Sequence, residues 1–122
     1  MQRKVAEINQ LVRNGRLWFD LDISSFNGHE LEIIGGIDLS YFYEIEIKFS
    51  NVCFLSGHTS SHIDTSEDFL FVHEDSYESS QMNLPKFRDN SFLFEFKTDD
   101  IDGLPFLVMA ENIEYKYERV NL

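Results

Sequence analysis

The sequence predicts an α+β protein that is mostly β, with an N-terminal helix followed by an antiparallel curved sheet. Apolar residues have helical spacing only near the N-terminus, whereas later segments alternate between apolar and polar residues and are separated by turn residues. Parallel strands need crossover connections, and no second helical pattern is visible, so we expect a sandwich or partial barrel of about seven strands. The length of 122 residues fits a single domain over residues 1–122.

The predicted helix covers about residues 2–14. Arg13 suits the negative end of the helix dipole, and Gly15 favours a stop there. One face of this helix carries an apolar stripe formed by Val5, Ile8, Leu11 and Val12.

The first predicted strands form hairpins. Alternation begins at Leu17, with Trp18, Asp20 and Asp22 on the polar side, and Asn27-Gly28 predicts a turn into a second strand over residues 31–34. Gly35-Gly36 then interrupts the pattern. The clearest strand covers residues 41–49, and residues 52–55 resume the pattern as its expected hairpin partner.

Later strands are predicted over residues 69–72, 91–97 and 106–110. Residues 113–118 alternate again, so the C-terminal part is either one long strand bent near Asn112 or two strands. A helix through residues 108–115 is disfavoured by the β-branched and aromatic side chains there. Residues 58–68 and 74–90 are polar and are expected to be long loops.

The chain has a formal net charge of −12, and its acidic residues are unevenly distributed. The first sixteen residues are basic overall, whereas no lysine or arginine occurs between Lys48 and Lys86. An acidic surface repels phosphate backbones and anionic membranes, so we expect neither nucleic acid nor membrane as a partner. It attracts a basic protein and speeds the encounter, although the same acidity also keeps a protein soluble and monomeric.

No catalytic residue, metal site or cofactor is predicted. His58 and His62 have the spacing of two ligands on a helix, but the glutamate of the metalloprotease motif is absent and Thr59-Ser60-Ser61 is poor helix material. Asp100 and Asp102 with Gly103 fail the calcium-loop pattern and indicate a solvated turn.

The compartment is expected to be the cytoplasm. Residues 1–10 are charged and polar, unlike a signal peptide, and apolar runs are far shorter than the ~20 residues of a membrane span. The single cysteine, Cys53, permits no intramolecular disulfide and is expected to be an inert thiol buried within a strand.

The chain resembles the small acidic immunity proteins of bacterial polymorphic toxin systems. The resemblance is carried by a run reading GGIDLSYFYEIEIKF, the following NVCFLS segment and a late AENIEY segment. It implies a protein without enzymatic activity that binds a toxin domain, often a basic nuclease, and blocks its active site or substrate groove.

These observations predict a non-catalytic acidic module that binds a basic protein, with an immunity protein against a basic toxin domain as the specific form. The residues predicted to contact the partner are Asp38, Glu44, Glu46, Asp64, Glu67, Asp68, Glu74, Asp75, Tyr77 and Glu78. One alternative is a small-ligand-binding or hydrolytic β-domain with a pocket containing His58, His62 or His73. Another is a structural subunit that pairs with itself through a strand edge, and the sequence leaves the oligomeric state open.

Overall fold

One helix precedes nine strands in the computed structural model, which describes residues 1–13, 17–74, 90–100 and 102–122. The helix predicted from helical spacing is present, and its expected last residue, Asn14, lies outside the described residues. In chain order the elements are α1 (Gln2–Arg13), β1 (Trp18–Phe26), β2 (Leu31–Gly36), β3 (Phe42–Ser50), β4 (Phe54–Ser56), β5 (Ser60–Asp64), β6 (Leu70–His73), β7 (Phe92–Phe96), β8 (Phe106–Ala110) and β9 (Asn112–Asn121).

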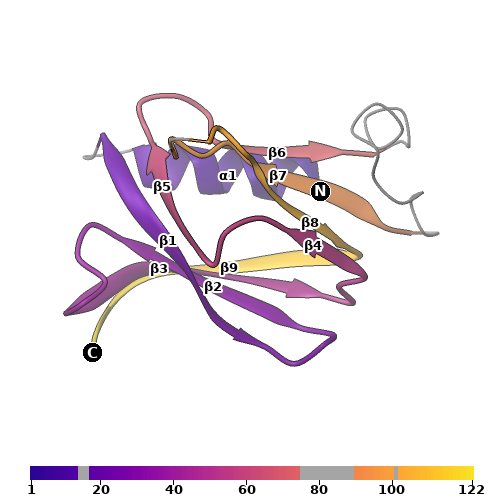
Figure 1. Cartoon of the computed structure of the whole chain (residues 1–122), viewed down its shortest axis with the longest axis horizontal. Helices are drawn as coiled ribbons and strands as arrows, with labels where there is room; N and C mark the ends of the chain where they lie inside the picture. Colours follow the sequence, from indigo (N-terminus) through magenta and orange to yellow (C-terminus); the bar gives the residue numbers. More distant parts are fainter. Residues whose placement is uncertain (14–16, 75–89, 101) are drawn as a thin grey trace.

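The strands form two antiparallel sheets that pack face to face (Figure 1). The five-stranded sheet has the order β5-β1-β2-β3-β9, and the four-stranded sheet has the order β4-β8-β7-β6. This arrangement confirms the predicted fold class, in the form of a sandwich. The described strands number nine rather than about seven because β5 was not expected and the C-terminal part is two strands.

The core lies between the sheets and is rich in phenylalanine. Phe49 of β3 packs against Phe94 and Phe96 of β7, with ring centroids 5.0 and 6.1 Å apart, and all three side chains are fully buried. The alternation that predicted the strands therefore places every second side chain in this core.

Helix α1 closes one side of the sandwich, where it contacts β6 and β9 (Figure 1). Lys4 Nζ donates to the carbonyl oxygen of Ile113 at 3.1 Å, and the Tyr115 hydroxyl donates to Glu7 at 2.7 Å. Among the described residues, no helix combines the length and the apolar character needed to cross a membrane.

The two predicted hairpins have different outcomes. β1 and β2 pair around the Asn27-Gly28 turn as expected. The second expected hairpin is wrong, because β4 belongs to the other sheet and pairs with β8. Asn51 adopts a positive φ of 56°, and the chain then changes sheets, with the Cys53 amide donating to Met109 at 2.9 Å.

The predicted loop over residues 58–68 contains an unexpected strand, β5, which is the edge of the five-stranded sheet. Only Ser61 and Ile63 of this strand face inward, so it lacks an apolar alternation. At the C-terminus, β8 and β9 lie in different sheets and are separated by Glu111, which settles the open choice in favour of two strands. The predicted loop over residues 74–90 lies almost entirely outside the described residues.

Candidate functional site

The outer face of β1 carries three polar or aromatic side chains, Trp18, Asp20 and Asp22. They alternate with Phe19 and Leu21, whose burial in the core forces their neighbours outward. Strand β5 continues this face, since its residues pair with those of β1 in the register Trp18↔Asp64, Asp20↔His62 and Asp22↔Ser60.

His62 is held by contacts from three directions. Its Nδ1 lies 2.8 Å from Oδ1 of Asp20, and its ring centroid lies 5.2 Å from that of Trp18. Its backbone amide donates to Oδ1 of Asp100 at 3.4 Å. The histidine therefore links β5 to β1 and to the segment that follows β7.

An open groove of about 440 Å³ runs beside this histidine. Asp38 borders it from the turn between β2 and β3, where its carboxylate accepts a hydrogen bond from the Ser40 amide at 3.3 Å. The residues that line the groove are Asp20, Asp22, Ile37, Asp38, Leu39, Ser40, Ser60, Ser61 and His62.

A second open hollow of about 610 Å³ adjoins the groove through Ser60, which lines both. The other residues that line this hollow are His58, Thr59, Asp100 and Asp102. Nε2 of His58 lies 2.5 Å from Oδ2 of Asp102, and this hydrogen bond raises the pKa of His58 and lowers that of Asp102.

We use the name aspartate surface for the five carboxylates around these hollows, Asp20, Asp22, Asp38, Asp100 and Asp102. The described residues that line the hollows include no lysine or arginine. Elsewhere, basic side chains already contact carboxylates, as in the pairs Lys48–Glu30 at 3.0 Å and Lys97–Glu67 at 2.8 Å. The aspartate surface is therefore rich in carboxylates, and the basic side chains that contact it are the imidazoles of His58 and His62.

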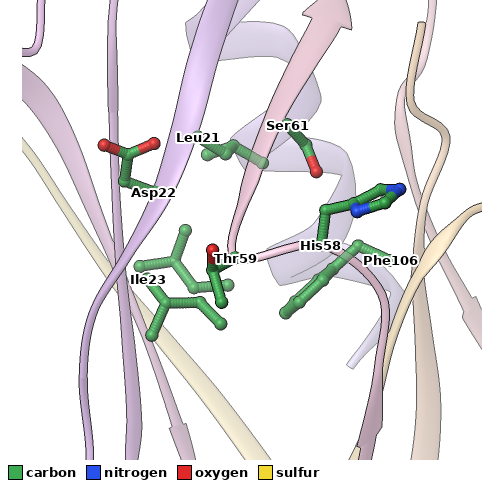
Figure 2. Close-up of a pocket in the computed structure, with 8 residues that line it drawn as sticks. Leu21, Asp22, Ile23, His58, Thr59, Ser61 and Phe106 are labelled. Carbon is green, nitrogen blue, oxygen red and sulfur yellow. The ribbon is translucent and has the colours of Figure 1, made fainter. Parts of the chain in front are cut away.

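A narrow slot leads from this region toward the core between the sheets (Figure 2). Apolar walls come from Leu21, Ile23 and Phe106, and His58 and Ser61 add polar groups. Its volume of about 10 Å³ accommodates about one water molecule. Figure 2 shows the Asp22 carboxylate turned away from His58 and Phe106, toward the outer face of β1.

The predicted contact residues are spread over several parts of the surface. Asp38 belongs to the aspartate surface, and Asp64 lies opposite Trp18, where hydrogen bonds from Ser66 lower the pKa of its carboxyl group. Glu67 and Asp68 follow β5, but each forms an ion pair, with Lys97 and Arg13 respectively. These pairs weaken the expectation that Glu67 and Asp68 attract a partner.

The other described residues of the predicted set do not line either hollow. Glu44 and Glu46 belong to β3, and Glu74 is exposed just after β6. Asp75, Tyr77 and Glu78 lie outside the described residues.

His73 and Cys53 do not join this region. Nε2 of His73 lies 2.9 Å from Oε1 of Glu95, and both residues belong to the four-stranded sheet. Cys53 precedes β4 rather than lying within a strand, and it is half-buried beside Met109 and Leu107. The expectation of a thiol buried within a strand is therefore wrong.

Sequence reasoning did not select Trp18, Asp20, Asp22, Asp100 or Asp102 as contact residues. The alternation in β1 had placed the first three on a polar face, which was the available signal. The two later aspartates reach the same region through the connection between β7 and β8, and no local pattern encodes that proximity.

Replacing Asp102 by asparagine is expected to lower the pKa of His58 toward the ordinary imidazole value of about 6.5. The reason is that the largest cause of the raised pKa is the hydrogen bond that the His58 imidazole donates to the Asp102 carboxylate. Histidine C–H resonances followed by NMR from pH 5 to 9 measure this change. Asp99→Asn is the control, and an equal shift in both variants would contradict the assignment to Asp102.

Within the described part of the chain, no group of three or more histidine, cysteine, aspartate or glutamate residues is placed to hold a metal ion. The hollows offer carboxylates and two imidazoles, and the partly exposed indole of Trp18 lies beside His62. These groups suit recognition of cations by ion pairs and ring contacts. The chain matches no protein-family model, no curated protein and no solved structure.

Proposed function

We propose that this chain is a non-catalytic binding module that recognises a basic protein through the aspartate surface. The observation that carries the proposal is that five carboxylates surround two adjoining hollows whose described lining residues include no lysine or arginine. Lysine and arginine side chains of a partner are the protein groups that best complement such a surface.

The surroundings of the aspartate surface support a protein partner rather than free cations. Trp18 is 42% exposed at its border, beside His62 and opposite Asp64. Partly exposed tryptophan is enriched among the residues that contribute most to protein interfaces, and a charged rim around it is typical. Ile37 and Leu39 add apolar contact area on the other side of the groove.

The specific form of this proposal is an immunity protein that acts in the cytoplasm and neutralises a basic toxin domain. A toxin domain that binds nucleic acid presents a positively charged groove, to which an acidic surface is complementary. The resemblance of the GGIDLSYFYEIEIKF, NVCFLS and AENIEY segments to immunity proteins supports this form.

A small-ligand-binding or hydrolytic domain is the second candidate, because His58 and Ser61 line one slot near the pair with Asp102. The slot volume of about 10 Å³ leaves room for about one water molecule and not for an organic substrate. The two larger hollows are open and lined mainly by polar residues, unlike the largely apolar pockets typical of small-ligand sites, which favours the protein-binding proposal.

The test compares two variants that lose the same number of charges. The first carries Asp20→Asn, Asp22→Asn, Asp38→Asn and Asp102→Asn, and the control carries Glu46→Gln, Glu74→Gln, Glu111→Gln and Glu118→Gln. The probe is a fluorescein-labelled hexa-arginine peptide, followed by anisotropy at several salt concentrations. We expect the first variant to bind about tenfold or more weakly, with a smaller salt dependence, and the control to change little.

Equal weakening in both variants would contradict the proposal, because it would mean that net charge alone attracts the peptide. A basic protein captured from lysate and eluted by salt is then tested with the same two variants. Binding of that protein must also depend on the aspartate surface for the proposal to stand.

A further inference from the structure

Two histidines lie among the carboxylates of the aspartate surface, and each already contacts one of them. His58 Nε2 lies 2.5 Å from Asp102, and His62 Nδ1 lies 2.8 Å from Asp20. They are the only described lining residues of the two hollows whose side chains can become cations near neutral pH. The protein thus supplies titratable counter-charges to the surface that we propose binds a basic partner.

The charged groups that face His58 come from the connection between β7 and β8. Asp102 forms the direct contact, and Asp100 adds a weaker electrostatic attraction. Both favour the imidazolium form, and the pKa of His58 is raised accordingly. At neutral pH His58 therefore carries more positive charge than an isolated histidine.

Charged groups approach His62 from β1, from β5 and from the segment that follows β7. Asp20 of β1 contacts the ring, Asp64 interacts with it from β5 itself, and Asp100 contacts its backbone amide. Its backbone carbonyl accepts a hydrogen bond from the Asp99 amide at 2.7 Å. Asp22 and Asp38 line the same groove, and Lys97, which acts on Asp64, is held by Glu67.

A protonated histidine and an incoming cation compete for the same carboxylate oxygens. When His58 is an imidazolium, its contact with Asp102 is an ion pair that a guanidinium must replace. When His58 is neutral, Asp102 remains a carboxylate, and the imidazole no longer carries a positive charge that competes with the guanidinium. The contact between His62 Nδ1 and Oδ1 of Asp20, at 2.8 Å, occupies a second carboxylate of the surface.

We propose that binding of a cationic partner at the aspartate surface competes with protonation of His58, so that binding releases a proton and strengthens as the pH rises from 6 to 8. This inference rests on the proposed function and adds that pH regulates binding at the same surface. By linkage, a bound partner must lower the histidine pKa by the same coupling with which protonation weakens binding.

The experiment titrates the hexa-arginine peptide into the whole protein by calorimetry at pH 6, 7 and 8 and constant ionic strength. The peptide is acetylated at its N-terminus, so that no α-amino group titrates, and arginine remains protonated throughout this range; pH changes therefore act on the protein alone. Buffers of different ionisation enthalpy report the number of protons released. We expect affinity to rise by about three- to tenfold between pH 6 and 8, because each released proton contributes at most tenfold per pH unit.

The double variant His58→Gln and His62→Gln is expected to bind with nearly the same affinity at all three pH values. The matched control is His29→Gln with His73→Gln, which removes two histidines outside the aspartate surface and should retain the pH dependence. In the unmodified protein, NMR of the His58 ring with saturating peptide should give a lower pKa than without peptide. This measurement does not depend on the folding of a variant.

The outcomes separate the two proposals. Binding that is independent of pH and releases no protons would overturn the coupling and leave the proposed function intact. Retention of the pH dependence in the His58→Gln, His62→Gln variant would also overturn the coupling. Absence of peptide binding at every pH would overturn the proposed function and this inference together.

Discussion

Replacing Asn9 by alanine is expected to lower the free energy of unfolding by about 2 to 4 kcal/mol, because it leaves buried backbone groups without hydrogen-bond partners. Asn9 is 5% exposed and lies on the inner face of α1. Its Oδ1 accepts from the amides of Phe69 and Leu70, each at 3.0 Å, and its Nδ2 donates to the Leu70 carbonyl at 2.8 Å. One side chain thus satisfies three backbone groups where β6 begins.

Urea unfolding followed by circular dichroism measures the effect. Gln10→Ala is the matched control, because Gln10 is the next residue of α1 and is exposed. We expect the control to change stability by less than about 0.5 kcal/mol, as is usual for surface substitutions. If Asn9→Ala were as stable as the control, the three hydrogen bonds would have no net effect, which would contradict this account of how α1 is attached.

Asn9 also illustrates how far helical periodicity predicts packing. The apolar stripe correctly identified Val5, Ile8 and Val12 as buried. A polar residue within the stripe gave no sign that it would be buried, because its partners Phe69 and Leu70 are about sixty residues away in the chain. Helical periodicity therefore predicts which face of α1 is buried. It does not predict that the backbone at the start of β6 requires a hydrogen-bonding side chain on that face.

The strands also show that local sequence patterns predict some elements, whereas contacts between distant segments leave no local pattern. β3 was predicted because Ile45, Ile47 and Phe49 alternate with polar residues, and these three side chains are indeed in the core. β5 was missed because an edge strand with inward-facing Ser61 and Ile63 buries too little apolar surface to produce a pattern. The hairpin expected for β4 was wrong because adjacency in sequence does not determine which sheet a strand joins.

The acidic region was predicted from counts of charge along the chain, and such counts do not say where each carboxylate lies in the fold. Asp38 is on the aspartate surface, whereas Glu67 and Asp68 are paired with Lys97 and Arg13 from distant elements. A count along the sequence includes no such pairs. The five residues of the aspartate surface lie between positions 20 and 102 of the chain. The arrangement of β1, β5 and their neighbouring connections brings them together.

Gly35 is the other position where a small change is expected to have a large effect. The pair Gly35-Gly36 was expected to interrupt the strand pattern, yet both residues belong to β2. A Cβ atom on Gly35 would lie 2.5 Å from Cε2 of Phe19 and 3.0 Å from Cγ2 of Ile45. The glycine is therefore required because the fully buried Phe19 ring occupies the space of a side chain.

Gly35→Ala is expected to lower the free energy of unfolding by about 1 to 3 kcal/mol, the usual range for overpacking a core. Gly36→Ala is the matched control, since its Cβ would lie no closer than 3.4 Å to Leu39 and Tyr43. We expect the control to remain within about 1 kcal/mol of the unmodified protein. Thermal and urea unfolding of both variants measure the difference.

A double-mutant cycle with Phe19→Leu tests the stated cause directly. Leucine is smaller than phenylalanine, so Gly35→Ala should destabilise the Phe19→Leu protein less than it destabilises the unmodified one. Additive effects would mean that the Phe19 ring is not what excludes a side chain at position 35. In that case the strain would lie against Ile45, and the same cycle with Ile45→Ala should show the coupling instead, because this substitution removes the Cγ2 atom of Ile45, which is the other close contact.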